Sequence, residues 1–370
     1  MPRIYHYCPS ITRRDAIGYS LTFLHNAMLA AGIPSFLVCD RNSLRFAPPF
    51  TLAFDEFVAL RPASDDVVLF HYSFADDNAA AMMETACRKV MVYHNITPGH
   101  YFRGVGQDGL ADACDRGRAH LGAMRGCFEA VAGDSGYNAA ELAEQGYPDP
   151  QVVPVFYNDR FFGDGGSGHA SFLERRATGQ ANLVFIGRYV PNKRLDNLIR
   201  VAGILKHQMG LPVRLRLHGK VWDRGYFLWL RQLAGELGVE GDVSFEHNQP
   251  QADLRASLAS ADAFVSVSEH EGFMVPLVEA FSSGCPVVAL ASSAVTETCG
   301  PAGCLVRDAD LELVAGHVAA IRTDRALRLA LIRGGSRRAA AFSSQRTLRK
   351  WDMVLRDFIP EPLVAHAHRV

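Results

Sequence analysis

Short apolar runs alternate with segments of helical periodicity along the whole chain. The runs are rich in Val, Ile, Leu and Phe, and they fall into two series. The first series covers residues 4–8, 36–39, 67–71, 90–94 and 130–132, and the second covers residues 183–186, 214–218, 243–246, 263–267, 286–290 and 303–306. Alternation of short strands with helices is typical of parallel sheets covered by helices on both faces. The pattern therefore predicts an α/β protein with two such sheets.

A segment rich in Gly and Ser, residues 162–179, separates the two series. Such a composition is typical of a boundary between domains. The expected parts are a first domain over residues 1–162, a linker over 163–180, a second domain over 181–345, and a C-terminal helix and frayed tail over 346–370. We expect the C-terminal helix to cross back to the first domain. Ligands of open parallel sheets bind beyond the carboxyl ends of the strands, so we expect the ligand in a cleft between the domains.

The charge-free span of residues 16–39 is long enough to raise the question of a membrane helix. It contains Gly18, Gly32 and Pro34, and its apolar residues recur at helical spacing, which predicts an amphipathic helix followed by a strand at residues 35–39. The N-terminus also lacks the basic and then apolar order of a secretory signal. We therefore expect a cytoplasmic protein.

Composition narrows the class of protein. The chain has 370 residues, of which 48% are hydrophobic, and a formal net charge of -1. That apolar content is enough for a core in each of two domains. The near-neutral charge argues against the broad basic field of a nucleic-acid-binding protein. The eight cysteines form no CxxC pair, so we interpret them as reduced core residues.

Two glutamates lie on either side of an expected helix start in the second domain. Glu271 precedes and Glu279 follows Pro276, which is well placed as the first helical residue. Both carboxylates can accept hydrogen bonds from sugar or ribose hydroxyls, and the amides at the helix start can face a ligand phosphate. These amides belong to Gly272, Phe273, Met274 and Val275. An ordinary helix start, with acidic residues opposing the helix dipole, explains the spacing as well.

A basic loop follows the first strand of the second domain. Gly187 forms the turn, and Arg188 and Lys193 come after it. A guanidinium can bind two phosphate oxygens and an ammonium can neutralise a leaving group, so this pair suits a diphosphate. A basic surface loop is the structural alternative.

Other strand ends carry candidate binding groups. His94 ends a predicted strand and precedes a Pro-Gly turn, so we expect its imidazole in the cleft, where it can bond a sugar hydroxyl; His71 is a weaker case of the same kind. Gly18 allows close approach of the backbone to a ligand. The residues at the strand ends expected to flank a nucleotide are His218, Gly219 and His247. Each of these residues also has an ordinary structural explanation as a strand terminator or hydrogen-bonding group.

The chain lacks the motifs of several other enzyme classes. There is no HExxH, GxSxG or P-loop motif, and the one GxGxxG, at residues 104–109, does not directly follow its strand. The only HxH lies in the expected tail, and the only DxD follows the last strand, where a helix cap explains it. We therefore expect no metal dependence and no bound cofactor.

Together the second-domain residues resemble the retaining glycosyltransferases of family 4, which have the GT-B fold of two Rossmann-like domains. Gly187 and Arg188 with Lys193 resemble the family's donor-diphosphate loop, and Glu271 with Glu279 resemble its paired glutamates. The following strand, residues 283–289, is similar as well. Met274 departs from the pattern because the family usually has Gly at that position.

The resemblance implies specific roles for these residues. It assigns Glu271 to the donor-sugar hydroxyls, Glu279 to the nucleotide ribose, Arg188 and Lys193 to the diphosphate, and His94 to the surroundings of the transferred sugar. The implied enzyme is a metal-independent hexosyltransferase that uses a nucleoside-diphosphate sugar, GDP-mannose or a UDP-sugar, and a glycan or lipid-linked oligosaccharide acceptor. Polysaccharide or lipopolysaccharide synthesis is the expected pathway.

Two alternative functions stay open from the sequence: a GT-B sugar-nucleotide epimerase and a noncatalytic sugar-nucleotide-binding protein. Peripheral contact with the inner membrane is a further hypothesis. It rests on arginines among apolar residues of the first domain, for which a solvated helix face is the structural alternative. These arginines are Arg103, Arg116, Arg118 and Arg125.

Overall fold

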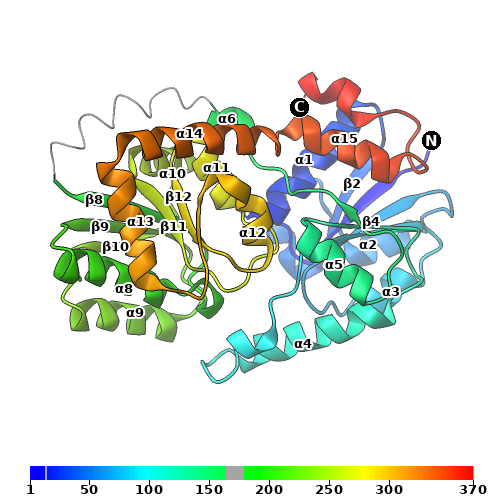
Figure 1. The fold of residues 1–370 in the computed structure, drawn as a ribbon. Helices are drawn as coiled ribbons and strands as arrows, with labels where there is room; N and C mark the ends of the chain where they lie inside the picture. Colours follow the sequence, from blue (N-terminus) through cyan, green and yellow to red (C-terminus); the bar gives the residue numbers. More distant parts are fainter. Residues whose placement is uncertain (13–14, 164–178, 370) are drawn as a thin grey trace. The chain divides into compact units, whose positions relative to one another are not determined.

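The computed structural model describes residues 1–12, 15–163 and 179–369 (Figure 1). The chain divides into two units, each with its own sheet. Unit 1 comprises residues 1–103, 107–157 and 342–370, and unit 2 comprises residues 104–106 and 158–341. No helix of the described residues is both long and apolar enough to cross a bilayer.

Unit 1 contains a seven-stranded parallel sheet with the order β3-β2-β1-β4-β5-β6-β7. Its strands are β1 (Ile4–Tyr7), β2 (Ser35–Cys39), β3 (Leu52–Ala53), β4 (Val67–Tyr72), β5 (Arg88–Tyr93), β6 (Ala130–Gly133) and β7 (Gln151–Val152). Every residue of β1 and β4 is buried. Such strands are continuous apolar runs because helices cover both faces of the sheet.

The helices of unit 1 come between these strands and from the end of the chain. They are α1 (Ala16–Ala30), α2 (Phe54–Ala59), α3 (Ala79–Met83), α4 (Asp108–Ala123), α5 (Gly136–Glu144) and α15 (Ser344–Leu355). Helix α15 is amphipathic, and its buried residues Leu348, Trp351 and Leu355 join a core cluster with Ile4 of β1 and Met28 of α1. The C-terminal helix therefore completes the core of unit 1, although it follows unit 2 in the sequence.

The segment after α15 contains a further helix, where the sequence predicts a frayed tail. A 3-10 helix covers Leu363–Arg369, and Leu363 is fully buried. The carboxylate of Asp352 accepts hydrogen bonds from the amides of Leu363 and Val364, at 2.5 and 3.2 Å. Burial of Leu363 and the two hydrogen bonds to Asp352 therefore attach this segment to α15.

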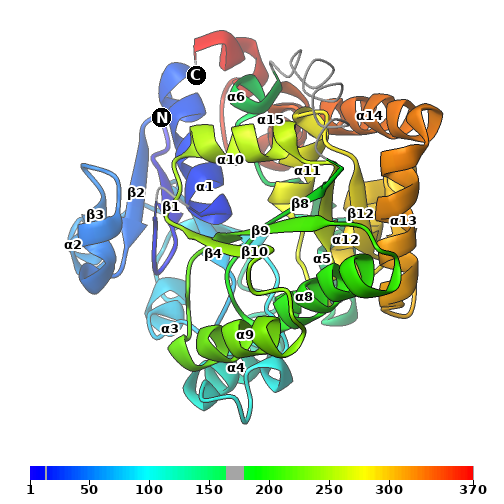
Figure 2. The ribbon, with the colours of Figure 1, turned by 90° about the vertical axis from the view of Figure 1, so that its left-hand side faces the viewer.

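Unit 2 contains a six-stranded parallel sheet with the order β10-β9-β8-β11-β12-β13. Its strands are β8 (Ala181–Ile186), β9 (Val213–Gly219), β10 (Val243–His247), β11 (Ala263–Ser266), β12 (Val287–Leu290) and β13 (Cys304–Val306). Its helices are α6 (Asp159–Gly163), α8 (Leu195–Gly203), α9 (Arg224–Glu236), α10 (Gln251–Ser260), α11 (Val275–Ser282), α12 (Ser293–Cys299), α13 (Leu311–Thr323) and α14 (Arg325–Ala340). Helices α8 and α13 cover one face, and α10 and α11 cover the other (Figure 2).

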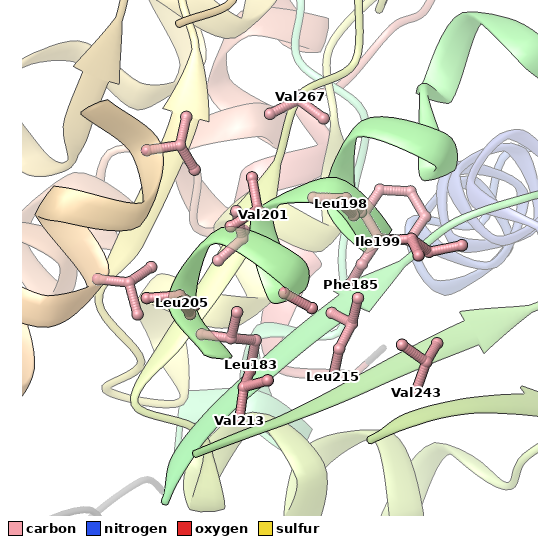
Figure 3. Close-up of a cluster of buried hydrophobic side chains, with 14 of the residues drawn as sticks. Leu183, Phe185, Leu198, Ile199, Val201, Leu205, Val213, Leu215, Val243 and Val267 are labelled. Carbon is pink, nitrogen blue, oxygen red and sulfur yellow. The ribbon is translucent and has the colours of Figure 1, made fainter. Parts of the chain in front are cut away.

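The main core of unit 2 lies between its sheet and α8. Leu183 and Phe185 of β8 pack with Leu198 and Val201 of α8 and with Leu215 of β9, and each of these side chains is at most 1% exposed (Figure 3). Alternate residues of a strand point to the same face, and residues three or four apart share a face of a helix. The apolar residues that recur at strand spacing in β8 and at helical spacing in α8 therefore pack against each other in this cluster.

The structure confirms the predicted fold class of two Rossmann-like parallel sheets. It also corrects three details. The two-residue strands β3 and β7 are too short for an apolar run to reveal them. Helix α11 begins at Val275, so Pro276 is its second residue. Cys127 is exposed, whereas most of the other cysteines are buried and none forms a disulfide. Residues 164–178 of the expected linker lie outside the described residues.

Substitution in α15 tests whether the end of the chain completes unit 1. We expect Leu348→Ala to lower the free energy of unfolding of unit 1 by about 3 kcal/mol, because a fully buried leucine leaves a cavity. The matched control is Met353→Ala on the same helix, which is 66% exposed and should change stability by less than about 0.5 kcal/mol. Urea denaturation followed by fluorescence measures both. Equal effects of the two substitutions would contradict the packing described above.

Candidate functional site

The strand order of unit 2 reverses next to β8. Strand β8 pairs with β9 on one side and with β11 on the other, and both neighbours are parallel to it. In open parallel sheets such a reversal leaves the loops at the carboxyl ends free to diverge, and ligands bind there. The loop after β8 contains Arg188 and Lys193, and the loop after β11 contains Glu271. Topology thus brings the two sequence-predicted loops together.

These two loops are joined by hydrogen bonds. The amide of Glu269 donates to the carbonyl of Asn192 at 2.9 Å. The side-chain amide of Asn192 donates to the carbonyl of His270 at 3.1 Å, and Asn192 is only 2% exposed. Arg194 forms ion pairs with Glu269 and with Asp196. Residues of the loop after β8 therefore hold the backbone of the loop after β11 in place.

A partly buried ion pair lies at the centre of this junction. Nζ of Lys193 is 2.7 Å from Oε1 of Glu271, and each side chain is 12% exposed. Burial lowers the pKa of Lys193, repulsion from Arg188 lowers it further, and the charge of Glu271 and its hydrogen bond counteract both effects. Lys193 and Glu271 thus form one ion pair between the two loops, and Arg188 lies in the same loop as Lys193.

A third loop supports Glu271 from the other side. The amide of Glu271 donates to Oγ of Ser293 at 2.8 Å, and the amide of Ala294 donates to the carbonyl of Glu271 at 3.3 Å. Ser292 donates to the carbonyl of Ser268 at 2.5 Å. The start of α12 therefore holds the glutamate loop. Sequence reasoning missed these serines because nothing in the sequence relates residues 292–293 to Glu271.

Met274 adopts the left-handed backbone conformation, with φ 78° and ψ 67°, and it is the N-cap residue of α11. A side chain in this region costs roughly 1–2 kcal/mol relative to right-handed backbone, and glycine avoids the cost. The methionine therefore occupies a backbone conformation that glycine favours, and glycine is the residue that the resemblance to the family leads us to expect at this position. Its side chain is 5% exposed, and its burial offsets the strain.

Glu279 lies in α11 and forms no salt bridge with the described residues. Burial raises the pKa of its carboxyl to about 7. The residue as a whole is partly exposed. A carboxyl that has no salt bridge with the described residues and a pKa near neutrality is suited to hydrogen bonding with a ligand hydroxyl.

Glycine allows the loops after β8 and β9 to approach each other. A Cβ atom at Gly219 would lie 1.9 Å from the carbonyl oxygen of Gly187. The amide of Gly187 donates to the carbonyl of His218 at 2.9 Å, so the ladder continues to the end of the strands. The structure thus gives both glycines a packing role within the protein.

The two predicted base-binding histidines differ in their surroundings. His218 is 2% exposed, burial lowers its pKa, and neither ring nitrogen has a partner among the described residues. His247 is exposed at the end of the edge strand β10. It lines a groove of 570 Å³ together with Phe227 and Phe245. The structure therefore separates a buried neutral imidazole from one that a ligand can reach.

His94 forms a buried chain with two other side chains of unit 1. Its Nδ1 lies 2.9 Å from Oδ2 of Asp134, and its Nε2 lies 2.9 Å from Nδ1 of His71. Because the carboxylate accepts from Nδ1, a neutral His94 accepts from His71 at Nε2. The side chain of His94 is 3% exposed. Contact with a sugar hydroxyl, as expected from the sequence, therefore requires the bond to His71 to break.

Gly18 lies in the first turn of α1, where the preceding loop folds back onto the helix. A Cβ atom there would lie 1.8 Å from the carbonyl oxygen of Thr12. The amide of Gly18 donates to Oδ1 of Asp15, which is the N-cap, at 2.6 Å. The close backbone approach predicted at this glycine is therefore made by the protein's own loop.

Sequence reasoning missed a polar cluster at the strand reversal of unit 1. Tyr7 ends β1, Asp40 follows β2, and Asp76 and Asn78 follow β4. The hydroxyl of Tyr7 lies 3.2 Å from Oδ1 of Asp40 and 3.0 Å from Oδ1 of Asp76, and Asn78 donates to Asp40 at 2.8 Å. Burial raises the pKa of Asp76 to about 6. The signal available in the sequence was the position of each residue after a strand.

Comparison with known proteins finds sequence similarity mainly in the second half of the chain. Residues 171–338 match the family model described as Glycosyl transferases group 1. O-antigen chain mannosyltransferase B of Escherichia coli is 30% identical over 143 residues, which are 38% of this chain and 36% of that protein. D-inositol 3-phosphate glycosyltransferase of Salinispora arenicola is 32% identical over 197 residues, 50% of this chain and 44% of that protein. The aligned part thus spans less than half of these relatives.

Solved structures are similar over nearly the whole chain. Sucrose-phosphate synthase from Thermosynechococcus elongatus has a TM-score of 0.75 at 18% identity, covering 96% of this chain and 99% of that one. Anabaena HepE in complex with UDP and glucose has a TM-score of 0.71 at 16% identity, covering 96% and 100%. The fold is therefore that of the GT-B glycosyltransferases, and the resemblance to glycosyltransferases found in the sequence is confirmed.

Substitution of Met274 tests the left-handed backbone. At an ordinary helical position glycine is less stable than alanine by about 1 kcal/mol. At Met274 we expect the reverse order, with Met274→Gly more stable than Met274→Ala by about 1 kcal/mol, because only alanine retains the backbone strain. The control pair is Ala280 and Ala280→Gly in α11. Urea denaturation measures the four proteins, and a less stable glycine variant at position 274 would contradict the conformation.

The raised pKa of Glu279 predicts a pH dependence of stability. Between pH 4.5 and about 7 the folded protein binds this proton more tightly than the unfolded chain, so stability falls as the pH rises through that window. Glu279→Gln removes the effect. Relative to the parent, we expect the variant to gain on the order of 2 kcal/mol between pH 4.5 and 8, measured by urea denaturation. A constant difference across this range would exclude the raised pKa.

Proposed function

We propose that this chain is a retaining glycosyltransferase that moves a hexose-type sugar from GDP-mannose or a UDP-sugar to a glycan or lipid-linked acceptor. The observation on which the proposal rests is the Lys193–Glu271 pair at the strand reversal of unit 2, with Arg188 in the same loop as Lys193. The names of the aligned relatives, a mannosyltransferase and an inositol-phosphate glycosyltransferase, support the reaction class.

Positive charge at this position suits a departing nucleoside diphosphate. Arg188 is exposed and has no ion pair with the described residues, so its guanidinium is available to phosphate oxygens. Lys193 is held near the same point by its bond to Glu271. Preorganised cations stabilise charge as it develops on a leaving group, and they need no reorganisation during the reaction. We propose that these two side chains supply that stabilisation without a metal ion.

Glu271 has a separate proposed role. When a diphosphate approaches Lys193, the ammonium gains a second anionic partner and its hold on Glu271 weakens. The carboxylate, whose backbone is fixed by Ser293, can then accept hydrogen bonds from donor-sugar hydroxyls. Glu279, which lacks a salt bridge with the described residues, would accept from the ribose. Lys193 and Glu271 would thus exchange each other for the donor as partner. Because both side chains are already held in place, the sugar is positioned with little loss of loop entropy.

The proposed chemistry needs no protein nucleophile. The bond between the anomeric carbon and the diphosphate oxygen breaks, and the acceptor oxygen forms the new bond on the same face of the sugar. The acceptor proton passes to an oxygen of the departing diphosphate. The role of unit 1 in this scheme is to supply acceptor contacts. Asp40 is partly exposed, and its carboxylate can accept hydrogen bonds from a hydroxyl-rich acceptor, whereas Tyr7 and Asp76 are buried.

Loss of either cation should reduce transfer. We expect Arg188→Ala and Lys193→Ala each to lower kcat/KM for the donor by roughly 10²–10³, because each removes charge stabilisation of the leaving group. Release of nucleoside diphosphate from a panel of UDP- and GDP-sugars, with candidate acceptors, provides the measurement. Arg200→Ala is the matched control, since Arg200 is an exposed arginine of α8.

Three outcomes would refute this function. Arg188→Ala turning over as fast as Arg200→Ala would refute the site. Conversion of the donor without any acceptor, seen by nuclear magnetic resonance, would indicate an epimerase instead. Donor binding without release of nucleoside diphosphate for any acceptor would indicate a binding protein.

A further inference from the structure

Two cationic side chains lie at the ring of an exposed tryptophan in the loop after β9. Trp222 is 47% exposed. Cζ of Arg188 lies 5.3 Å and Nζ of Lys220 lies 5.8 Å from the centroid of its ring. Both distances are within the range at which the face of an indole ring attracts a cation. A single exposed tryptophan is ordinary on a protein surface, and what distinguishes Trp222 is that cations from two different loops lie at its ring.

The backbone fixes this arrangement. Pairing between β8 and β9 continues beyond the strand ends, because the amide of Tyr189 donates to the carbonyl of Lys220 at 3.0 Å and Tyr189 forms an isolated bridge with Val221. The contact of Gly219 with Gly187 leaves no room for a Cβ atom. The segments that carry Arg188, Lys220 and Trp222 are therefore joined by their own hydrogen bonds.

The charges of the two cations are not neutralised within the described residues. Neighbouring cations have acidic partners, since Lys193 pairs with Glu271 and Arg194 pairs with Glu269. No carboxylate among the described residues forms an ion pair with Arg188 or Lys220. An aromatic ring attracts cations but leaves their charge intact, so two positive charges remain at one ring. A group with two negative charges would satisfy both of them.

We propose that Lys220 is a third cation for the diphosphate of the donor, and that Trp222 is a positioning residue that holds Arg188 and Lys220 toward it. This inference rests on the proposed function, because it assumes that the anion at Arg188 is a nucleoside diphosphate. It adds the loop after β9 to the two loops already described. Three adjacent strands, β9, β8 and β11, then each contribute a charged side chain to one end of the donor.

Direct binding of UDP and GDP tests the proposal without an acceptor. Isothermal titration calorimetry with Trp222→Leu and with Lys220→Gln should each show affinity about tenfold weaker for whichever diphosphate the parent binds more tightly. Trp222→Phe keeps an aromatic face and should restore affinity to within about threefold of the parent. Lys220→Gln should also reduce the dependence of affinity on salt concentration, because one fewer cation contacts the phosphates.

Trp229→Leu is the matched control. Trp229 is 44% exposed on α9, and its ring contacts Tyr226. The Trp229→Leu variant should bind UDP and GDP as tightly as the parent does. The proposal is overturned if Trp222→Leu binds as tightly as Trp229→Leu, if Trp222→Phe is as weak as Trp222→Leu, or if Lys220→Gln leaves both affinity and its salt dependence unchanged.

The experiment separates this inference from the proposed function. If the parent binds a diphosphate through Trp222 and Lys220 but transfers no sugar, the inference stands and the enzymatic activity fails. If the parent transfers sugar and the variants bind as it does, the inference alone fails. If the parent binds neither UDP nor GDP at millimolar concentration, both are refuted.

Discussion

The ion pair of Lys193 with Glu271 is the constraint on which the site of unit 2 depends. It joins two loops that lie about eighty residues apart in the sequence, and it does so where burial disfavours an unpaired charge. Removal of one partner from a mostly buried pair leaves the other charge uncompensated, which is far more costly than loss of a surface pair. The bonds of Asn192 to the backbone of Glu269 and His270 keep the two side chains in register.

Much of the fold followed from the sequence because parallel strands buried on both faces are continuous apolar runs. The runs at residues 67–71 and 183–186, for example, both lie within observed strands. The positions of the two charged loops of unit 2 could be predicted as well, since each directly follows such a strand. Strands β3 and β7 could not be predicted, because two residues carry no periodicity.

The side-chain contacts missed at the sites have one physical cause. Hydrogen bonds between side chains from different strands depend on strand order, and strand order is not encoded by any local pattern. The bond between His71 and His94 arises because β4 and β5 are neighbours, and the cluster of Tyr7 with Asp76 arises at a strand reversal. The left-handed backbone of Met274 has a separate cause, because its residue type disfavours the conformation that the surrounding structure imposes.

The place of α15 in unit 1 has a consequence for the order in which the protein is made. Residues 158–341, nearly all of unit 2, leave the ribosome before Leu348 and Trp351, which unit 1 needs for its core. Domains generally fold as units during synthesis, with the N-terminal one first. Here unit 2 can finish first, although its sequence starts later, and the sheet of unit 1 must wait with an apolar face uncovered. The nascent chain is therefore most exposed to aggregation through its first half.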